Sequence, residues 1–428
     1  MSKFMNTNKV NQKYINALCI FFLLFITSKI FSHETAGSFS SYRIPERAIE
    51  FPDTDKYLTI IADLHTHSVF SDGHVWPNIR VSEALRDGLD AIAITEHLEY
   101  QPHISDIPHK DRNTAYRIAA EAAKNTNLIV ISGSEITREN PIGHMNAIFI
   151  EDSNKLMSLD KSKIAEADKL VEERKDEVAV HGGIDMANHL ALASLWPVAN
   201  AVNKANEQGG FVFWNHPTYK VNNGIATPSK EHIEFIKNGT LHGIEVVNEN
   251  IFSEEAFTIA LEYNLTIIGT SDVHNLIDWD YSSHLGQHRP VTLILAEERT
   301  KPAIKEALMK GRTVVWYKNL LIGREKNIQP LLNAMMRIDS ARYQDNSEIL
   351  EVTIKNNSDT KIQMTNLSGY SFASNHDIIE IPAHSEINLN VKTKELLTSI
   401  SLEFEILNAL VRPKTHPTLI LHSNIASD

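Results

Sequence analysis

A regular alternation of short β-rich runs and amphipathic helical stretches organises the chain between Thr59 and Tyr317. Runs such as TIIA, DAIAI, LIVI and FVFW are rich in β-branched and aromatic side chains, which is typical of buried strands. The stretches between them carry helix signals, for example Pro77 at a helix start and Gly88 after its end. About seven such β–α units predict a parallel sheet, and their number favours a closed barrel of the α/β class.

The pattern changes after about Gly323, where helical periodicity fades. Alternating apolar and polar residues take its place in the runs Ile349–Lys355, Ile378–Ile381, Ile387–Val391 and Leu402–Ile406. These runs predict a small all-β, sandwich-like domain. We therefore expect a signal peptide at 1–32, a leader segment at 33–57, a barrel at 58–323 with a helical insertion at about 151–210, and the β-sandwich-like domain at 324–428.

The first residues have the features of a targeting segment. Lys3, Lys9 and Lys13 precede an apolar run at 17–26, and small residues around Ser32 offer a cleavage zone. This combination predicts a cleavable signal peptide and an exported protein, periplasmic or secreted. The alternative is a segment that is kept as a membrane anchor. No later stretch reaches the roughly 18 apolar residues that span a membrane, so we expect the mature protein not to be membrane-spanning.

The composition limits the kinds of metal site that the chain can build. Its 428 residues include 20 histidines but only one cysteine, Cys19. Cysteine-based zinc fingers, iron–sulfur sites and disulfide scaffolds are therefore excluded, and a metal site must use His, Asp and Glu. The formal net charge of −13 argues against a protein that coats nucleic acid, which requires a basic surface. The charge does not exclude a small anionic ligand held by metal ions, and the oligomeric state is left open.

Side chains that can ligate metals gather where the predicted strands end. The first strand leads into Asp63-Leu64-His65-Thr66-His67, in which His65 and His67 point to the same side. Alone, one such pair is expected by chance in a chain with this many histidines. Further motifs stand in the same loop and beside later strands: Ser71-Asp72-Gly73, Thr95-Glu96-His97, Ser132-Gly133-Ser134-Glu135, Gly143-His144, Asn215-His216-Pro217 and Ser271-Asp272-Val273-His274. Because the carboxyl ends of barrel strands converge on one mouth, we expect one clustered metal site there.

The order of these motifs resembles the PHP (polymerase and histidinol phosphatase) superfamily. The resemblance rests on DLHTHSVFSDG, TEH, SGSE, NHP and SDVH and covers about Leu58 to Tyr317. Within the superfamily, the chain looks most similar to secreted bacterial PHP phosphodiesterases. The resemblance implies a distorted (β/α)7 barrel with up to three metal ions at its mouth. It implies three groups of ligands: His65, His67, Glu135 and Asp272; then Glu135 again with His144 and His216; and Asp72, His97 and His274.

The chemistry of this ligand set agrees with the resemblance. Imidazoles with few carboxylates suit Mn, Zn or Fe better than Ca or Mg, so we expect two or three divalent transition-metal ions. Water activated by such ions attacks phosphorus without a serine or cysteine nucleophile. Together with this chemistry, the resemblance implies a metal-dependent phosphoesterase that acts on a small phosphorylated substrate, with a phosphodiesterase favoured and with Asp272, Glu135 and His216 as catalytic residues. The alternatives are a phosphomonoesterase or an amidohydrolase at the same centre, and a non-catalytic module stabilised by metal.

Substrate contacts are predicted around the loop Glu99–Arg112, which follows the strand that ends at His97 and is expected to overhang the mouth. Arginine suits phosphate contacts, and the predicted substrate-binding residues are Tyr100, His103, Arg112 and Arg138. A solvated loop without such contacts is the alternative. His181 and His189 of the insertion match no ligand position, and we expect them at the surface or in a lid.

Overall fold

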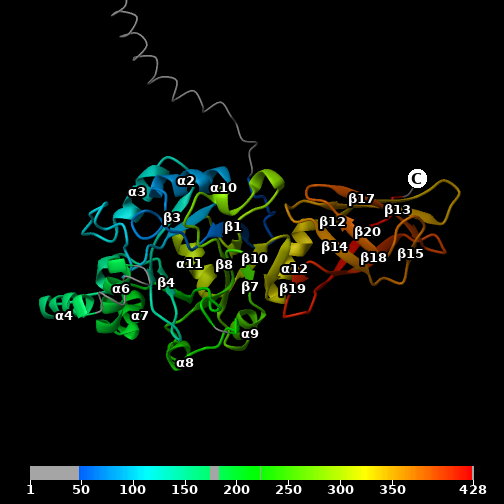
Figure 1. The fold of residues 1–428 in the computed structure, drawn as a ribbon. Helices are drawn as coiled ribbons and strands as arrows, with labels where there is room; N and C mark the ends of the chain where they lie inside the picture. The colour runs from blue at the N-terminus through cyan, green and yellow to red at the C-terminus, as the bar shows by residue number, and fades with distance from the viewer. Residues whose placement is uncertain (1–47, 174–182, 222, 427–428) are drawn as a thin grey trace, which may run out of the picture. The chain divides into compact units, whose positions relative to one another are not determined.

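The computed structural model describes residues 48–173, 183–221 and 223–426 (Figure 1). The predicted signal peptide at 1–32, most of the leader segment at 33–57, and His181 lie outside the described residues. In the part of the chain that is described, every helix is too short or too polar to cross a membrane.

A twelve-stranded mixed sheet with helices packed around it forms the larger part of the fold (Figure 1). Its order is β19-β11-β10-β9-β1-β2-β3-β4-β5-β6-β7, with β8 paired to β6. The strands are β1 (Leu58–Asp63), β2 (Ala91–Ile94), β3 (Ile129–Ile136), β4 (Met145–Ile148), β5 (Phe211–Trp214), β6 (Gly243–Asn248), β7 (Ile251–Phe252), β8 (Thr266–Thr270), β9 (Val291–Ala296), β10 (Thr313–Tyr317), β11 (Leu320–Gly323) and β19 (Ala409–Leu410). The helices are α2 (Pro77–Arg86), α3 (Thr114–Ala123), α4 (Lys161–Glu173), α6 (Gly183–Leu195), α7 (Val198–Glu207), α8 (Lys230–Lys237), α9 (Glu254–Glu262), α10 (Ile277–Asp280), α11 (Lys301–Met309) and α12 (Glu325–Met335), with short 3₁₀ turns at Ser153–Leu156 and Ser283–Leu285.

The expected α/β barrel class with a C-terminal β domain is confirmed, but the sheet is not wholly parallel. Strands β1, β2 and β3 pair in parallel, as do β5, β6 and β8. Strand β4 runs antiparallel to both β3 and β5, and β9 runs antiparallel to β1. The short connection at 137–144 explains the reversal of β4, because a parallel crossover needs about a dozen residues or more. As a result, the N-terminal end of β4 lies beside the C-terminal end of β3.

Side-chain contacts of β8 with β9 and β10 close the curl of the sheet. The hydroxyl of Thr292 accepts from the backbone N–H of Gly269 at 3.0 Å and donates to the carbonyl of the same residue at 2.8 Å. A Cβ on Gly269 would lie 2.3 Å from Cγ1 of Val315, so only glycine fits there. Beyond the ends of the strands, Thr66 and Val273 form an isolated parallel bridge. The carboxyl ends of β1 and β8 therefore lie side by side.

The helical insertion has a small core of its own. Helices α4 and α6 pack against each other through the buried side chains of Ala167, Val171, Ala187 and Ala191. The indole N–H of Trp196, just after α6, donates to the carbonyl of Leu156 at 2.8 Å, and this bond ties the end of α6 to the 3₁₀ turn at Ser153–Leu156.

Two antiparallel four-stranded sheets form the C-terminal domain, in the orders β12-β13-β17-β15 and β16-β14-β18-β20. Their strands are β12 (Met336–Tyr343), β13 (Ile349–Asn356), β14 (Ile362–Asn366), β15 (Ser371–Phe372), β16 (Ile378–Ile381), β17 (Glu386–Lys392), β18 (Ser399–Ile406) and β20 (Thr418–Asn424). The sequence does not predict helix α12, which directly follows Gly323. Its buried Ile328, Leu331 and Leu332 belong to one apolar cluster with residues of both domains, such as Trp316 and Leu419.

Candidate metal centre

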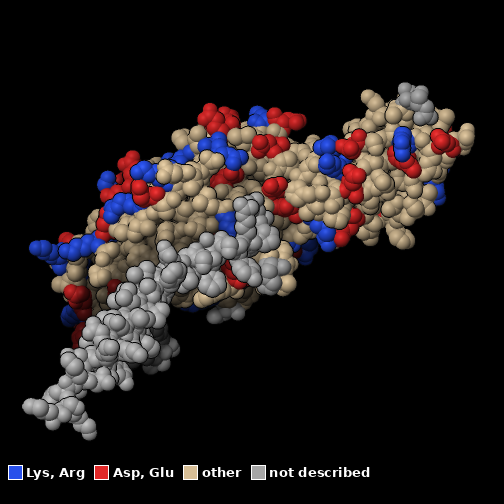
Figure 2. Space-filling model, turned by 90° about the horizontal axis from the view of Figure 1, so that it is seen from above, with Lys and Arg blue, Asp and Glu red and all other residues tan. Residues whose placement is uncertain are grey.

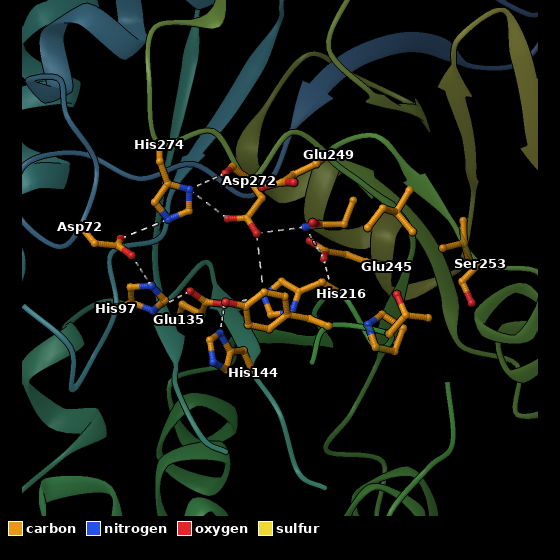
Figure 3. Close-up of a pocket in the computed structure, with 16 residues that line it drawn as sticks. Asp72, His97, Glu135, His144, His216, Glu245, Glu249, Ser253, Asp272 and His274 are labelled. Carbon is orange, nitrogen blue, oxygen red and sulfur yellow. Dashed lines mark hydrogen bonds and ion pairs between the residues drawn. The ribbon is translucent and has the colours of Figure 1, made fainter. Parts of the chain in front are cut away.

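Nine side chains predicted as metal ligands lie close together at one end of the sheet. Figure 3 shows all of them except His65 and His67. The backbone N–H of His67 donates to the carbonyl of Val273 at 3.1 Å, and that of Asp272 donates to the carbonyl of His65 at 3.0 Å. Ligand atoms within 4.8 Å of one another form three groups: His67, Asp72, His97 and His274; His65, His67 and Asp272; and His97, Glu135 and His144. These groups overlap with the predicted ones, but His67 also lies close to Asp72, and His97 also lies close to Glu135.

Glu135 lies at the centre of this arrangement because β3 extends to Ile136, beyond the predicted strand end at Ile131. Its Oε1 lies 2.9 Å from Nδ1 of His144 and 3.3 Å from Nε2 of His216. Its Oε2 lies 2.7 Å from Nδ1 of His97. One carboxylate thus faces side chains from three separate segments of the chain.

The reversed direction of β4 explains the position of His144. This residue precedes its strand, whereas the other predicted ligands follow theirs or lie within one. Because β4 runs antiparallel to β3, the residue before it reaches the same end of the sheet as Glu135. A parallel sheet would have carried His144 to the opposite end.

The unsatisfied atoms of the cluster fit bound cations. Nε2 of His65 and Nε2 of His67 lie 3.0 Å apart and 3.1 and 3.2 Å from Oδ1 of Asp272. Buried carboxylate oxygens of Asp72, Glu135 and Asp272 accept no hydrogen bond from residues 48–173, 183–221 and 223–426, although imidazole nitrogens lie within ion-pair distance. Buried polar atoms without partners are costly, and cations shared by these nitrogens and oxygens would satisfy them.

The pKa values of the clustered histidines are shifted by burial and by the neighbouring charged groups. Burial lowers the pKa of His65, but the carboxylates of Asp272, Glu245 and Glu135 outweigh it and raise this pKa well above its ordinary value. Burial, with the neighbouring His274, lowers the pKa of His67 to about 4. A histidine that is neutral at neutral pH can offer a lone pair to a metal ion.

Glu245 of β6 is a site residue that the sequence analysis misses. Its Oε1 lies 2.9 Å from Nδ1 of His65 and accepts from the hydroxyl of Thr270 at 2.6 Å. Its Oε2 accepts from the backbone N–H of His216 at 2.7 Å and from Nδ2 of Asn248 at 2.9 Å. By accepting a hydrogen bond from Nδ1–H of His65, this carboxylate keeps the ring proton on Nδ1 and leaves Nε2 free to bind a cation. The only signal in the sequence is an acidic residue inside an apolar strand.

Arg80 of α2 fixes the loops that carry the ligands. Its side chain is 1% exposed and donates to the carbonyls of His67, Asn275 and Val273 at 2.8, 2.6 and 3.2 Å. Glu83 forms an ion pair with the same guanidinium at 2.7 Å. This charge therefore holds the loop after β1 and the loop after β8 together.

Two of the predicted ligands have backbones in the left-handed region, with φ of 25° at His216 and 49° at Asp272. Residues with a Cβ rarely adopt this conformation, which costs roughly 1–2 kcal/mol. The hydrogen bonds to Glu245 and His65 hold the two backbones in place. Such strain concentrates at functional sites, where a side chain must point in one particular direction.

Three cavities border the cluster. The first, of about 160 Å³, is lined by predicted ligands together with Glu245, Asn248 and Glu249. The second, of about 440 Å³, extends from His97 and His144 toward Tyr100, Arg138 and His189. The third, of about 330 Å³, extends from Asp272 and His274 toward Trp279 and Tyr281. An organic group attached to a phosphate therefore has room beside the cluster.

The structure separates the predicted substrate-binding residues into two pairs. Tyr100 and Arg138 line the second cavity. Arg112 and His103 line none of these three cavities; Nε of Arg112 donates to the carbonyl of Leu98 at 3.0 Å, and the ring of His103 lies 6.5 Å from that of His74.

His189 of the insertion is neither exposed nor remote from the site. Its side chain lines the second cavity and its ring lies 5.7 Å from that of Tyr100. The sequence carries a weak signal for this position, a single histidine within the apolar stretch ANHLALASL.

The comparisons with known proteins agree with this site. The PHP domain family matches residues 63–237 and an Ig-like domain family matches residues 336–422. No curated protein matches the chain. Two other solved structures match with TM-scores below 0.5. One is a protein of Bifidobacterium adolescentis whose name reads "putative metal-dependent phosphoesterase" (21% identity, 50% of this chain and 87% of that chain, TM-score 0.35), and the other is an amidohydrolase of Chromobacterium violaceum (17% identity, 50% of this chain and 87% of that chain, TM-score 0.34).

A solved structure from Bacteroides vulgatus is similar along nearly its whole length. Its name describes a two-domain protein that contains a predicted PHP-like metal-dependent phosphoesterase. The similarity covers 88% of this chain and 98% of that chain, with 33% sequence identity and a TM-score of 0.73. With the PHP motifs, the barrel and the clustered ligands in place, the chain belongs to the PHP family of metal-dependent phosphoesterases.

Proposed function

We propose that the protein is an exported metal-dependent phosphodiesterase that hydrolyses small organic phosphate diesters. The observation that carries the proposal is that two of the three cavities beside the ligand cluster, the second and the third, are separate from each other. The second and third cavities share no lining residue, and each has ligands of the cluster in its wall. A phosphodiester carries two organic groups, and each cavity has room for one of them.

The residues of the cluster fit two or three divalent transition-metal ions, held by the nine ligands named above. When bound, such ions would supply hydroxide at neutral pH and positive charge for the phosphoryl oxygens. Asp272 and His216, which both line the first cavity, would return a proton to the leaving oxygen. Tyr100 and Arg138 would position the ester from the wall of the second cavity.

Charge also favours a diester over a monoester. Glu249 and Asp280 stand in the wall of the third cavity and bring negative charge close to the cluster. A monoester dianion carries one more negative charge than a diester and is repelled more strongly there. On the face shown in Figure 2, Lys and Arg side chains lie among Asp and Glu side chains instead of forming one basic stripe, which supports a small substrate over a nucleic acid.

The test is hydrolysis of bis(p-nitrophenyl) phosphate and of p-nitrophenyl phosphate by protein purified without chelator, with metal content measured on the same sample. We expect faster hydrolysis of the diester, loss of activity with a chelator, and recovery with Mn, Zn or Fe. Asp272→Asn should abolish turnover, whereas Asp168→Asn, on the exposed surface of α4, should not. Faster monoester hydrolysis would refute the diester proposal. Bound metal without turnover of either ester would favour an amidohydrolase or a non-catalytic module.

Export rests on residues 1–32, with lysines before an apolar run and small residues after it. The test is cell fractionation of the full chain followed by mass determination of its N-terminus. Export with a mature N-terminus near residue 33 is expected, and Leu23→Arg with Leu24→Arg should keep the protein inside the cell. Full-length protein in the cytoplasmic fraction of the unmodified strain would contradict the proposal.

A further inference from the structure

The second cavity contains polar atoms that the proposed chemistry does not use. His189 is 5% exposed, and its buried Nδ1 has no hydrogen-bond partner among the described residues. Nε of Arg138, in the same cavity, is also buried without a partner in the part of the chain that the structure describes, and that residue is 7% exposed. A buried polar atom without a partner destabilises the protein, and a ligand with a complementary group would satisfy it.

Aromatic rings line the same cavity. The Tyr100 ring lies 5.7 Å from the His189 ring and 5.7 Å from the His97 ring, in edge-to-face arrangements. Tyr219 also lines this cavity and is 51% exposed, and the ammonium of Lys220 lies 4.9 Å from the centre of its ring. Rings and unsatisfied polar atoms around about 440 Å³ suit a ring-shaped organic group that also forms hydrogen bonds.

The position of His189 depends on the docking of α6. The α4–α6 pair has its own small core, and Nη2 of Arg138 donates to the carbonyl of Trp196 at 2.8 Å, just beyond α6. The insertion thus brings a recognition group to a centre that the barrel strands build.

We propose that α6 supplies a specificity-determining residue: the imidazole of His189, facing Tyr100, binds a ring-shaped organic group of the phosphodiester in the second cavity. The proposal rests on the proposed phosphodiesterase activity and adds the class of ester that the centre prefers, one with a cyclic, hydrogen-bonding group over one with a small alkyl group. His189 contacts the substrate and is not one of the nine metal ligands.

The test compares two diesters with the same leaving group, bis(p-nitrophenyl) phosphate and methyl p-nitrophenyl phosphate, in the full, metal-loaded protein. The unmodified protein should prefer the aryl ester. His189→Ala should lower kcat/KM for the aryl ester by roughly 10- to 30-fold, since it loses one hydrogen bond and one ring contact, and should leave the methyl ester within about twofold. Asn188→Ala, at the exposed neighbouring position of α6, is the matched control and should change neither value.

Two outcomes would overturn the inference while leaving the phosphodiesterase proposal in place: equal losses on both esters in His189→Ala, or no loss on either. A protein that hydrolyses neither ester would refute the proposed function, and binding then decides the inference. Phenylphosphonate should bind the unmodified protein more tightly than methylphosphonate, and His189→Ala should remove that preference. An unchanged preference in the variant would refute the role of His189.

Discussion

Replacement of Glu245 by glutamine should weaken metal binding although the two side chains have almost the same shape. Four donors point at this carboxylate, two at each oxygen: Nδ1 of His65 and the hydroxyl of Thr270 at Oε1, and the backbone N–H of His216 and Nδ2 of Asn248 at Oε2. The amide of glutamine has one acceptor oxygen and one donor NH₂ group. In either orientation, the NH₂ group therefore faces two donors.

Both orientations of the glutamine amide should weaken metal binding. An NH₂ group near His65 turns Nδ1 of that ring into an acceptor, and the ring proton then sits on Nε2, where the cation should bind. An NH₂ group on the other side opposes the backbone N–H of His216 and disturbs the strained backbone that carries that ligand. Loss of such an orienting partner typically costs about 10- to 100-fold in metal affinity. We expect Glu245→Gln to fall in this range.

The assay is metal titration against a competing chelator, with activity followed at each free metal concentration. Glu262→Gln, an exposed position on α9, is the matched control for the loss of one charge. Glu245→Gln should regain part of its activity at high metal concentration, whereas the control should follow the unmodified protein. Metal affinity within twofold of the unmodified protein, with correct folding shown by circular dichroism, would refute the assignment of Glu245 as the residue that orients His65.

Three further predictions concern stability. In chelator-treated protein, the pKa of His274 is raised to about 9: burial lowers it, but the carboxylates of Asp72 and Asp272 outweigh burial. Protonated His274 therefore stabilises the folded protein. This stabilisation is complete below the ordinary pKa of 6.5 and is lost as the pH rises toward 9, so the Tm of metal-free protein should fall over this range; a constant Tm would contradict the prediction. Arg80→Met breaks a buried ion pair and should cost about 3–5 kcal/mol in urea unfolding, whereas a loss below 1 kcal/mol would show that the loops hold without it. Removal of residues 324–428 exposes the apolar cluster shared by both domains and should give aggregation or a lower Tm; a barrel that stays monomeric with an unchanged Tm would refute that dependence.

The metal ligands could be predicted from sequence because their signals are local. His65 and His67 stand two residues apart after one strand, and Asp272 and His274 do so after another. The chain needs only to place both strand ends at one mouth, which the barrel topology does. The direction of β4 was not predicted, so the reason for the position of His144 appears only in the structure.

The supporting residues could not be predicted because their roles depend on contacts distant in sequence. Glu245 and His65 are 180 residues apart, and nothing near either of them indicates the other. Arg80 lies on a helix, where a sequence alone presents it as one more exposed charge. Its burial results from the packing of α2 against two loops that end separate strands.

Recognition of the substrate is even less visible in the sequence, as Arg138 illustrates. Its charge suggests a phosphate contact, yet Nη1 pairs with the buried carboxylate of Glu99 and Nη2 binds the carbonyl of Trp196. The guanidinium therefore fastens the segment after α6 to the end of β3, and its Nε has no partner among the residues that the structure describes. His189 shows the opposite case, a histidine in an apolar helix that tertiary packing brings beside Tyr100. The motifs of a barrel mouth thus indicate the reaction class, whereas the choice of ester depends on how the inserted helices dock, which short-range patterns do not encode.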